Sequence, residues 1–413
     1  MANAFQNPVM YTQGVLRALV NNIVLGKQVN RSNQDQFGKD EMKIGDTINV
    51  RRPARFTVST GQTFAAQDYT ETSIPLVVNL QKHIDTAFTS SDMTLKLQDL
   101  SDRLWKPAGI QIAQQIDIDG YLNAKNTVGN LTGTAGTSPN ALSFLTDVGK
   151  KLDDFSTPRD GNRFIAMDQG SNASMIQVFP TYFNPTSQIS EQYKEGVFLD
   201  GTNTFGAKLA MSQNVARHTV GALGGSPVVN GAAQSLVAGW ANTGTLVTNG
   251  WTAAALQRVN AGDIFTIANV SSVNPITRQA NTALLQVVVT TAASSDASGN
   301  LTLTFSPAII TAGPFQNATA APVNGAALTF IGTAATSYAR NIAWHKDAFQ
   351  LAVVPMVDLG KFGGWGSVQT QENFSLRVFR QAAISNDTVG NSLAALYGWA
   401  TLYPEQATQQ VSA

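Results

Sequence analysis

Three histidines, His83, His218 and His345, are the residues of this chain best suited to bind a metal or to act as a general base. A protein metal site needs further histidine, cysteine or carboxylate ligands at short, regular spacing. None of the three histidines has a second ligand type at such a spacing. The sequence therefore predicts an ordinary surface or core histidine at each position and no metal site.

Two closely spaced aspartates, Asp117 and Asp119, are the clearest candidates for a paired acid and base. They lie in a segment with helical periodicity, where residues two apart point in different directions. We therefore expect that they do not act together on one substrate. Two adjacent pairs of like charge, Lys150–Lys151 and Asp153–Asp154, are explained by solvated helix faces.

A glycine-rich stretch, GKFGGWG, invites comparison with a phosphate-binding loop. Its glycine spacing differs from that of a P-loop, and no Lys-Ser or Lys-Thr follows it. The chain also lacks cysteine and the GxGxxG and GxSxG motifs. We expect neither an enzyme nor a cofactor-binding protein. The stretch is better explained as a hinge, with four candidate residues: Gly360, Gly363, Gly364 and Gly366.

The densest basic cluster consists of Arg51, Arg52 and Arg55. Because arginine suits planar pairing with carboxylates across an interface, these residues are candidates for a contact between subunits. A solvated strand face explains them equally well. DNA binding is the weakest of the three interpretations, because the 27 basic and 27 acidic residues of the chain cancel.

The composition places the chain among soluble, intracellular proteins of two or three domains. Its 413 residues are ample for a core. The longest apolar runs, such as Leu284–Val289, are far too short to span a bilayer. The N-terminus, MANAFQNPVM, lacks the basic start and apolar core of a signal peptide. We therefore expect no membrane partner, and with no cysteine the fold must be stabilised by packing alone.

Charge is distributed very unevenly along the chain. The 121 residues from Thr219 to Ala339 carry only four charged side chains: Arg258, Asp263, Arg278 and Asp296. This stretch is rich in Thr, Ala, Asn, Gly and Val, which is typical of a β domain. The flanking segments read as two halves of one domain that the neutral stretch interrupts. An inserted domain needs both of its ends close together on the host surface.

The N-terminal part is predicted to hold one helix and two extended arms. Apolar residues recur at helical spacing from Val15 to Val24, and Gly26 is a plausible stop. This helix either packs on its own core or docks on a neighbouring subunit. Residues 46–59 and 73–89 are predicted to be extended, and a 14-residue arm reaches roughly 45 Å. The arms form either a ribbon that reaches beyond the domain or a hairpin packed flat on it.

The remaining segments are mixed α+β, without βαβ repetition. Helices are predicted at residues 92–105, 107–126, 141–155 and 171–178. Strands are predicted in the host at residues 163–167, 349–358, 373–384 and 393–403, the last of which is also compatible with a helix. The neutral stretch is predicted to contain strands at residues 263–270, 284–290 and 301–305.

This order of elements resembles that of tailed-phage major capsid proteins, and more specifically the coat protein of the short-tailed Salmonella-phage type. Three local segments are similar to that family in the right order and spacing. They are SEQYKEGVFLDGTNTFGAKLAMSQNVARHT (Ser190–Thr219), VNAGDIFTIANV (Val259–Val270) and ALYGWATLYPE (Ala395–Glu405). The resemblance extends over nearly the whole chain.

The resemblance implies an α+β Hong Kong 97-type capsid fold with an inserted β-barrel-like domain. Its parts would be an N-terminal arm (1–45), an extended β ribbon (46–89), a peripheral domain (90–160) with a spine helix (107–126), an axial domain (161–218), the inserted β domain (219–339) and a returning segment (340–413). It also implies that subunits gather as pentamers and hexamers, and that the insert assists folding and contacts between capsomers.

The chain departs from the family in two places. Some members carry a charged loop in the insert, whereas residues 241–252 of this chain have no charge, so ionic bridging there is not expected. Some relatives of the fold weld subunits by a Lys–Asn bond from the extended loop. No lysine lies between Asp46 and Gln81, so we expect no covalent mesh.

The function that the resemblance implies is that of a major capsid protein, located in the virion and, during assembly, in the host cytoplasm. Its partners would be further copies of itself, a scaffolding protein, a portal and, in some relatives, a decoration protein, with DNA enclosed but not bound by sequence. Arg17, Lys27 and Arg31 are the candidates to meet an acidic or helical assembly partner. Two alternatives stay open: the shell of a non-viral compartment, and a binding or adhesion module built on the insert.

Overall fold

The computed structural model describes residues 8–34, 37, 47–62, 64, 66–67, 71–89, 104–178, 203–204, 206–232, 234, 240–359, 365–383 and 387–413. The chain divides into two compact units. The first is drawn from residues 1–50, 73–120 and 350–400, and the second from residues 51–72, 121–349 and 401–413. The six-part division inferred from the sequence stays a prediction, and the helix expected at 92–105 lies almost wholly outside the described residues.

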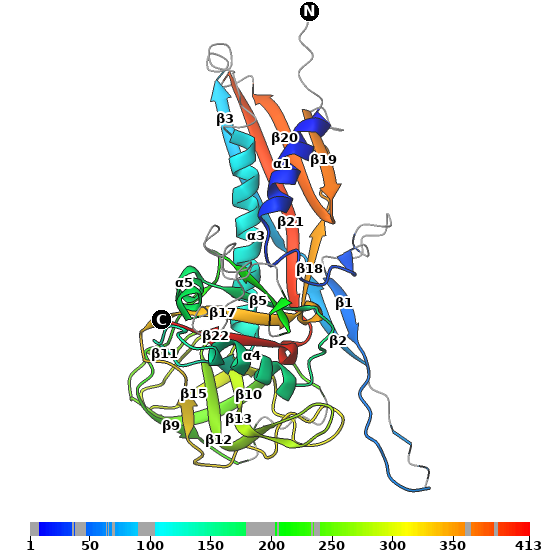
Figure 1. Ribbon diagram of the computed structural model, residues 1–413. Coiled ribbons are helices and arrows are strands. Elements are labelled where there is room, and N and C mark those ends of the chain that lie inside the picture. The colour runs from blue at the N-terminus through cyan, green and yellow to red at the C-terminus, as the bar shows by residue number, and fades with distance from the viewer. Residues whose placement is uncertain are drawn as a thin grey trace, which may run out of the picture. The chain divides into compact units, whose positions relative to one another are not determined.

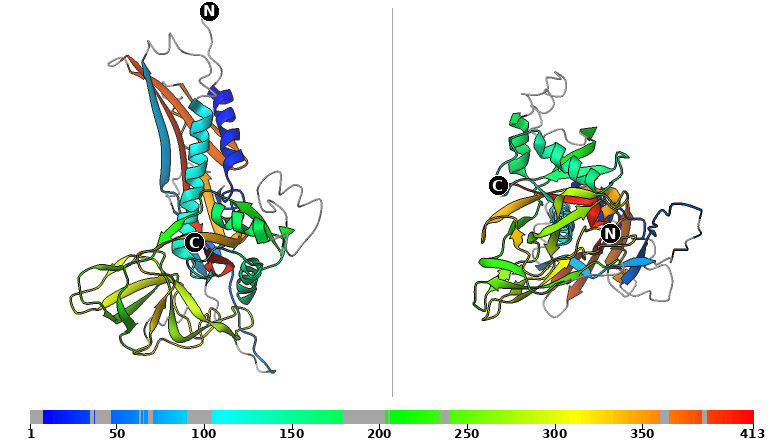
Figure 2. Two further views of the ribbon diagram at one scale, coloured as in Figure 1. Left: turned by 60° about the vertical axis from the view of Figure 1, so that its left-hand side comes forward. Right: turned by 90° about the horizontal axis from the view of Figure 1, so that it is seen from below.

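Two helices contribute to the first unit, α1 (Pro8–Asn22) and most of α3 (Lys106–Thr127). They confirm the helices predicted from the apolar periodicity, although α1 begins well before Val15. Pro107 lies in the first turn of α3, a position that proline favours. The helices lie side by side (Figures 1 and 2). Gly109 permits this approach, because a Cβ at that position would lie 2.6 Å from Cγ1 of Val15. None of the described helices is long and apolar enough to cross a membrane.

The first unit contains a five-stranded sheet built around the long strand β21 (Thr388–Thr401). On one side β21 pairs with β20 (Phe374–Ala383), which pairs with β19 (Trp365–Gln371). On the other side it pairs with β3 (Leu80–Thr89) and β18 (Phe349–Val354). The strands predicted at 349–358, 373–384 and 393–403 are thus confirmed. β19 was not predicted, because its first two residues belong to the glycine-rich run 360–366.

The two predicted arms are shorter than expected. Strand β1 (Thr47–Arg52) ends at Pro53, which cannot donate to a sheet ladder, so the prediction of an extended strand to residue 59 is wrong beyond Arg52. The second arm breaks at Val78 and Asn79 into β2 (Thr72–Val77), which pairs with β1, and β3. The described residues between Pro53 and Glu71 form a loop without regular structure, here called the extended loop.

The second unit contains a sheet of seven strands from distant parts of the chain. Its order is β4 (Leu131–Thr132), β22 (Ala407–Val411), β17 (Ser337–His345), β5 (Arg163–Met167), β7 (Ala207–Met211) and β6 (Asn203–Thr204), and β8 (Arg217–Thr219) pairs with β17. Helices α4 (Ser143–Asp154) and α5 (Gln169–Val178) belong to the same unit. The apolar face of α4 packs on β5 and β7 through Leu145, Val148 and Leu152. The strand and both helices predicted in this region are confirmed.

The neutral stretch forms a six-stranded antiparallel sheet that nearly closes into a barrel (Figure 1). The strand order is β16 (Leu328–Phe330), β12 (Ile264–Val273), β13 (Ala280–Val289), β15 (Leu301–Ser306), β10 (Gly244–Trp251) and β9 (Gly225–Val229). The two edge strands meet at a bridge between Val228 and Ala327. Two short strands, β11 (Gln257–Val259) and β14 (Ala293–Ser294), pair separately. All three strands predicted here are confirmed, whereas residues 241–252 are mostly strand β10 and not a loop.

Candidate assembly surfaces

The two ends of the insert lie side by side in the sheet of the second unit. Strand β8 enters the insert and β17 leaves it, and the two pair antiparallel, with Ser337 opposite Thr219 and Ala339 opposite Arg217. Just beyond this pairing, the Val220 amide donates to the Thr336 carbonyl at 3.0 Å. The insert therefore begins and ends at one place on the host, as its neutral composition led us to expect.

A buried histidine–aspartate contact fixes this junction. Nε2 of His218 lies 2.7 Å from Oδ1 of Asp263, and both side chains are 1% exposed. Oδ2 of Asp263 also accepts from the amides of Gly221 (3.1 Å) and Asn260 (2.7 Å). Burial lowers the pKa of His218 from its usual value, against the opposing effect of Asp263. His218 therefore acts as a buried core residue that joins the insert to its host strand.

The other two histidines also have carboxylate neighbours. His345 is buried, with Nε2 3.1 Å from Asp160, and its Nδ1 accepts from the Asp347 amide at 3.3 Å. His83 is exposed and lies 2.8 Å from Asp85. Across the described ranges, no group of three or more His, Asp or Glu side chains is placed to hold a metal ion.

Asp117 and Asp119 point to different neighbours, as their spacing predicted. Asp117 is buried and accepts from the amides of Val24 (2.7 Å), Leu25 (3.2 Å) and Gly26 (3.0 Å), which follow α1. Burial raises its pKa to about 6, although the three amides act in the opposite direction. Asp119 instead accepts from the hydroxyl of Tyr397 at 2.6 Å. Asp117 therefore fixes the N-terminal segment on α3 and has no catalytic partner in Asp119.

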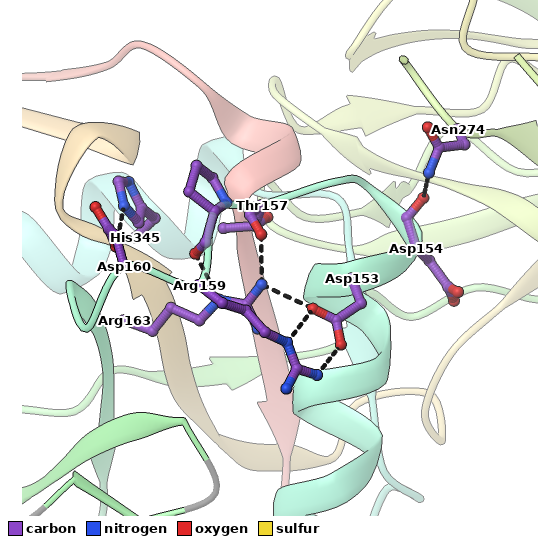
Figure 3. A network of polar contacts seen from close by, with 9 residues as sticks. Asp153, Asp154, Thr157, Arg159, Asp160, Arg163, Asn274 and His345 are labelled. Atoms are coloured by element: carbon purple, nitrogen blue, oxygen red, sulfur yellow. Dashed lines mark hydrogen bonds and ion pairs between the residues drawn. The ribbon is translucent and has the colours of Figure 1, made fainter. Parts of the chain in front are cut away.

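A second attachment of the insert lies at the end of α4 (Figure 3). Nδ2 of Asn274, in the turn between β12 and β13, donates to the Asp154 carbonyl at 2.9 Å. Oδ1 of Asn274 accepts from the Ser156 hydroxyl at 2.9 Å and from the amides of Ile276 and Thr277 within its own turn. One side chain thus shapes the tip of the hairpin and holds it on the host.

The residues after α4 are themselves held by a buried arginine (Figure 3). Arg163, at the start of β5, donates to the Pro158 carbonyl at 2.9 Å, to Oδ1 of Asp153 at 2.7 Å and to the Thr157 carbonyl. Arg159 binds the same carboxylate, and its hydrogen bond together with that of Arg163 lowers the pKa of Asp153. The residues that bind Asn274 thus belong to a hydrogen-bonded network at the end of α4.

A third attachment joins the barrel to β4. The side-chain amide of Gln286 in β13 accepts from the Leu131 amide at 2.9 Å and donates to the Leu131 carbonyl at 3.0 Å. Gly129 lies so close that a Cβ there would be 2.9 Å from the Gln286 carbonyl oxygen. With three separate attachments, the insert is a fixed part of the second unit and not a domain on a flexible tether.

The three arginines predicted as interface candidates have different environments. Arg52 is 4% exposed, lies between the rings of Trp240 and Tyr403, and donates to Oε1 of Glu405 at 2.5 Å. Arg55 donates to the same oxygen at 2.7 Å. Arg51 is exposed and pairs with Glu71 at 3.2 Å. Arg52 and Arg55 therefore have partners within the chain, and a role at an interface stays a prediction for this cluster.

The predicted assembly-partner residues also differ. Arg17 and Lys27 are exposed. Nη1 of Arg31 donates to the Glu372 carbonyl at 2.5 Å, and its guanidinium lies over the ring of Phe374. Arg31 therefore holds the tight turn between β19 and β20. Among the hinge candidates, Gly366 is in β19 opposite Phe379, and Gly360, Gly363 and Gly364 lie outside the described residues.

The extended loop exposes three large apolar side chains that the sequence reasoning missed. Phe56 is 62% exposed, Val58 is 98% exposed and Phe64 is 90% exposed. Single exposed apolar residues are common, but three on one loop make it a candidate contact surface. The sequence signal was available: bulky apolar residues recur in FTVSTGQTF, a stretch too polar to build a core.

A loop with exposed apolar residues and a barrel with few charges, hydrogen-bonded to its host at three places, suit a protein that associates with other copies. The sequence matches the family model "P22 coat protein - gene protein 5" over residues 1–412. The chain belongs to the P22 coat protein family. The resemblance stated from the sequence is thereby confirmed, together with the α+β Hong Kong 97-type capsid fold carrying an inserted barrel-like β domain.

Solved structures with a similar chain path come from other particles. The chain of Mycobacterium phage Che8 is 9% identical, with a TM-score of 0.45, and the match covers 94% of this chain and 90% of that one. The mature capsid of bacteriophage PhiM1 is 8% identical (TM-score 0.43; 90% and 83% covered). A virus-like particle from Pyrococcus furiosus is 8% identical (TM-score 0.40; 98% of both chains covered). No curated protein sequence matches the chain.

Membership of the P22 coat protein family gives the protein its role. It is a structural, non-enzymatic protein that self-assembles into a capsid, and its location is the virion shell. The hydrogen-bonded carboxylates and histidines described above therefore serve to hold one chain in a fixed shape for assembly.

Proposed function

We propose that this coat protein assembles, as pentamers and hexamers, into an icosahedral shell that encloses a double-stranded DNA phage genome. The observation that carries the proposal is the extended loop of a P22-family coat protein, whose Phe56, Val58 and Phe64 are exposed. A closed shell needs each subunit to make several different heterologous contacts. A projecting loop with apolar side chains supplies one of them, since burying such side chains is favourable.

The insert contributes a surface of a different kind. Of its four charged residues, Arg258 and Asp263 are buried, which leaves Arg278 and Asp296 for the whole barrel surface. We propose that contacts between capsomers made by the insert are apolar and hydrogen-bonded. Individually weak contacts suffice in a shell, because many act together.

The partners proposed for assembly are a scaffolding protein and a portal, and in addition a decoration protein on the finished shell. Assembly takes place in the host cytoplasm. Exposed Arg17 and Lys27 support a contact of the N-terminal segment with an acidic partner, whereas Arg31 is bound to the β19–β20 turn. DNA is enclosed without sequence-specific binding, which suits a chain whose net charge is zero.

The two alternatives receive less support. The match to a phage coat family favours the viral shell over a non-viral compartment. An adhesion module built on the insert is disfavoured by the three attachments that hold the barrel in the second unit, at Asp263, Asn274 and Gln286.

The test is to express the chain with and without its scaffolding partner and to examine the products by negative-stain electron microscopy. We expect closed shells of uniform wall thickness when the partner is present. Monomers or small oligomers under both conditions would contradict the proposal. Cargo enzymes in purified particles, in place of a packaged genome and a portal, would instead support the compartment alternative.

A further inference from the structure

A buried arginine in the second unit has no acceptor for its side chain. Arg340, in β17, is 2% exposed, and its backbone is held in the sheet opposite Val411. Within the described part of the chain, Nε, Nη1 and Nη2 of Arg340 all lack a hydrogen-bond partner. A guanidinium has five N–H donors and no acceptor of its own. Leaving a buried charged donor unpaired is costly, so the site calls for an acceptor.

The carboxylate that acts on Arg340 already has other partners. Burial lowers the pKa of Arg340 to about 10, and the negative charge of Asp263 opposes this effect. Oδ1 of Asp263 lies 2.7 Å from Nε2 of His218, and Oδ2 accepts from the amides of Gly221 and Asn260. Asp263 therefore attracts Arg340 through its charge without accepting a hydrogen bond from it.

A second cation shares this region. Lys125, in the last turn of α3, is half-buried. Burial lowers the pKa of Lys125, the charge of Arg340 lowers it further, and that of Asp263 raises it. Both cations also lower the pKa of His218. Two positive side chains thus face one carboxylate, which leaves an excess of one positive charge before any proton is added to His218.

A water molecule and a small anion are the two occupants that suit such a site. Water is favoured by Asn126, whose Oδ1 lacks a donor within the described residues and lies beside Nδ1 of His218: a Cβ at Gly262 would be 3.1 Å from both atoms. However, a water molecule accepts two hydrogen bonds and brings no charge. An anion accepts from several N–H groups and also neutralises the excess positive charge. Chloride is close to water in size and needs no large cavity.

We propose that the junction between the insert and its host binds a small inorganic anion at Arg340, with Lys125 supplying the second positive charge. The site lies where β8 enters the insert and β17 leaves it. A bound anion would hold α3 and β17 to the start of the barrel. Because Arg340 is 2% exposed, an acidic side chain of a partner protein does not reach it in the folded subunit. The inference concerns the single subunit and does not rest on the proposed shell function.

The test measures the stability of the full-length, unassembled subunit in chloride and in gluconate. Ionic strength and pH are kept constant, so that screening of surface charges is the same, and gluconate is too large for a buried site. A ligand that binds only the folded chain lowers the unfolding constant in proportion to its concentration above the dissociation constant. We expect urea unfolding of wild type to show this constant falling roughly tenfold for each tenfold rise in chloride.

Arg340→Met removes the charge and keeps a long apolar side chain. Replacing a buried charge by an apolar group is often neutral or stabilising. The variant is therefore expected to be at least as stable as wild type in gluconate and to show no dependence on chloride. Arg217→Met, an exposed position of the adjacent strand β8, is the matched control and should keep the dependence of wild type.

Equal stability of wild type in chloride and gluconate would overturn the proposal and leave water as the occupant. A chloride dependence that Arg340→Met retains would also overturn it, because the anion would then act on the surface or on the unfolded chain. Lys125→Met provides a second comparison if Arg340→Met does not fold. It is expected to raise the chloride concentration at which stabilisation begins roughly tenfold or more, and an unchanged concentration would contradict the proposal.

Discussion

Nε2 of His218 lies 2.7 Å from Oδ1 of Asp263 across the junction at which the insert leaves its host strand. His218 belongs to β8 in the host sheet, and Asp263 immediately precedes β12 in the barrel. The same carboxylate binds the Gly221 and Asn260 amides, so it joins the entry to the insert, the turn before β12 and the host strand. The barrel has few charged residues, and one of them, the buried Asp263, lies at the junction with the host strand.

Replacement of His218 by asparagine is expected to destabilise the second unit. Asp263 would keep its two amide donors but lose its side-chain partner in a buried site, at a cost of about 1–3 kcal/mol in the free energy of unfolding. Urea unfolding followed by tryptophan fluorescence measures the change, since Trp251 is buried in the barrel. The control is His83→Asn at an exposed pair, where a change within about 0.5 kcal/mol is expected. Equal effects of the two variants would contradict the assigned role.

The lowered pKa of His218 predicts that the stability of the fold depends on pH. Burial, opposed by Asp263 and assisted by Arg340 and Lys125, lowers the pKa of His218 below its usual value of 6.5. The unfolded chain therefore binds this proton more tightly than the folded chain. The contribution of His218 to stability is fully present above pH 6.5 and is lost as the pH falls through 6.5 towards the folded pKa. Unfolding curves of wild type should show this loss, and those of His218→Asn should lack it; the same slope in both would exclude His218 as its source.

Asp117 should be essential for seating the N-terminal segment on α3. Its two oxygens accept three backbone amides, whereas asparagine has one acceptor oxygen and would turn an N–H₂ group towards an amide. We expect Asp117→Asn to cost about 1–3 kcal/mol and to increase hydrogen exchange at Val24, Leu25 and Gly26. Asp147→Asn, at an exposed position of α4, is the control. Unchanged exchange at the three amides would show that the carboxylate does not hold them.

Mature shells of this protein are expected to contain no covalent links between subunits. The stretch from Asp46 to Gln81 has no lysine to form a Lys–Asn bond. Boiled shells should therefore run on a denaturing gel as one band near 43.9 kDa. A ladder of subunit multimers would refute this expectation.

Local pattern was sufficient to predict much of the fold. The helical periodicity after Pro107 gave α3, the apolar run 163–167 gave β5, and the neutral composition gave the insert with its adjacent ends. Strand β10 escaped prediction because its glycine, asparagine and threonine residues are typical of loops, and β19 because it begins within the glycine-rich run 360–366. Their strand conformation comes from partners elsewhere in the chain, which no local pattern contains.

The neighbours of Arg52 could not be predicted from the local sequence either. Its carboxylate partner, Glu405, lies 353 positions away in the sequence, and Trp240 and Tyr403 complete its surroundings. A run of arginines at the start of a polar loop predicts that all of them are exposed. Only the fold shows that one of them, Arg52, is buried. Exposed Phe64 is the converse case, since an aromatic residue is normally assigned to a core.

Arg52 and Arg51 offer a matched comparison of buried and exposed ion pairs. Glu405→Gln removes the charge that Arg52 faces at 2.5 Å while Arg52 stays 4% exposed. Leaving a buried charge without its partner costs about 3–5 kcal/mol, reduced here by the two aromatic rings that still hold the guanidinium. Glu71→Gln breaks the exposed Arg51 pair, which is worth about 0–1 kcal/mol. Urea unfolding of the two variants should therefore differ clearly, with Glu405→Gln the less stable. Comparable stabilities would mean that the rings, and not the carboxylate, keep Arg52 buried.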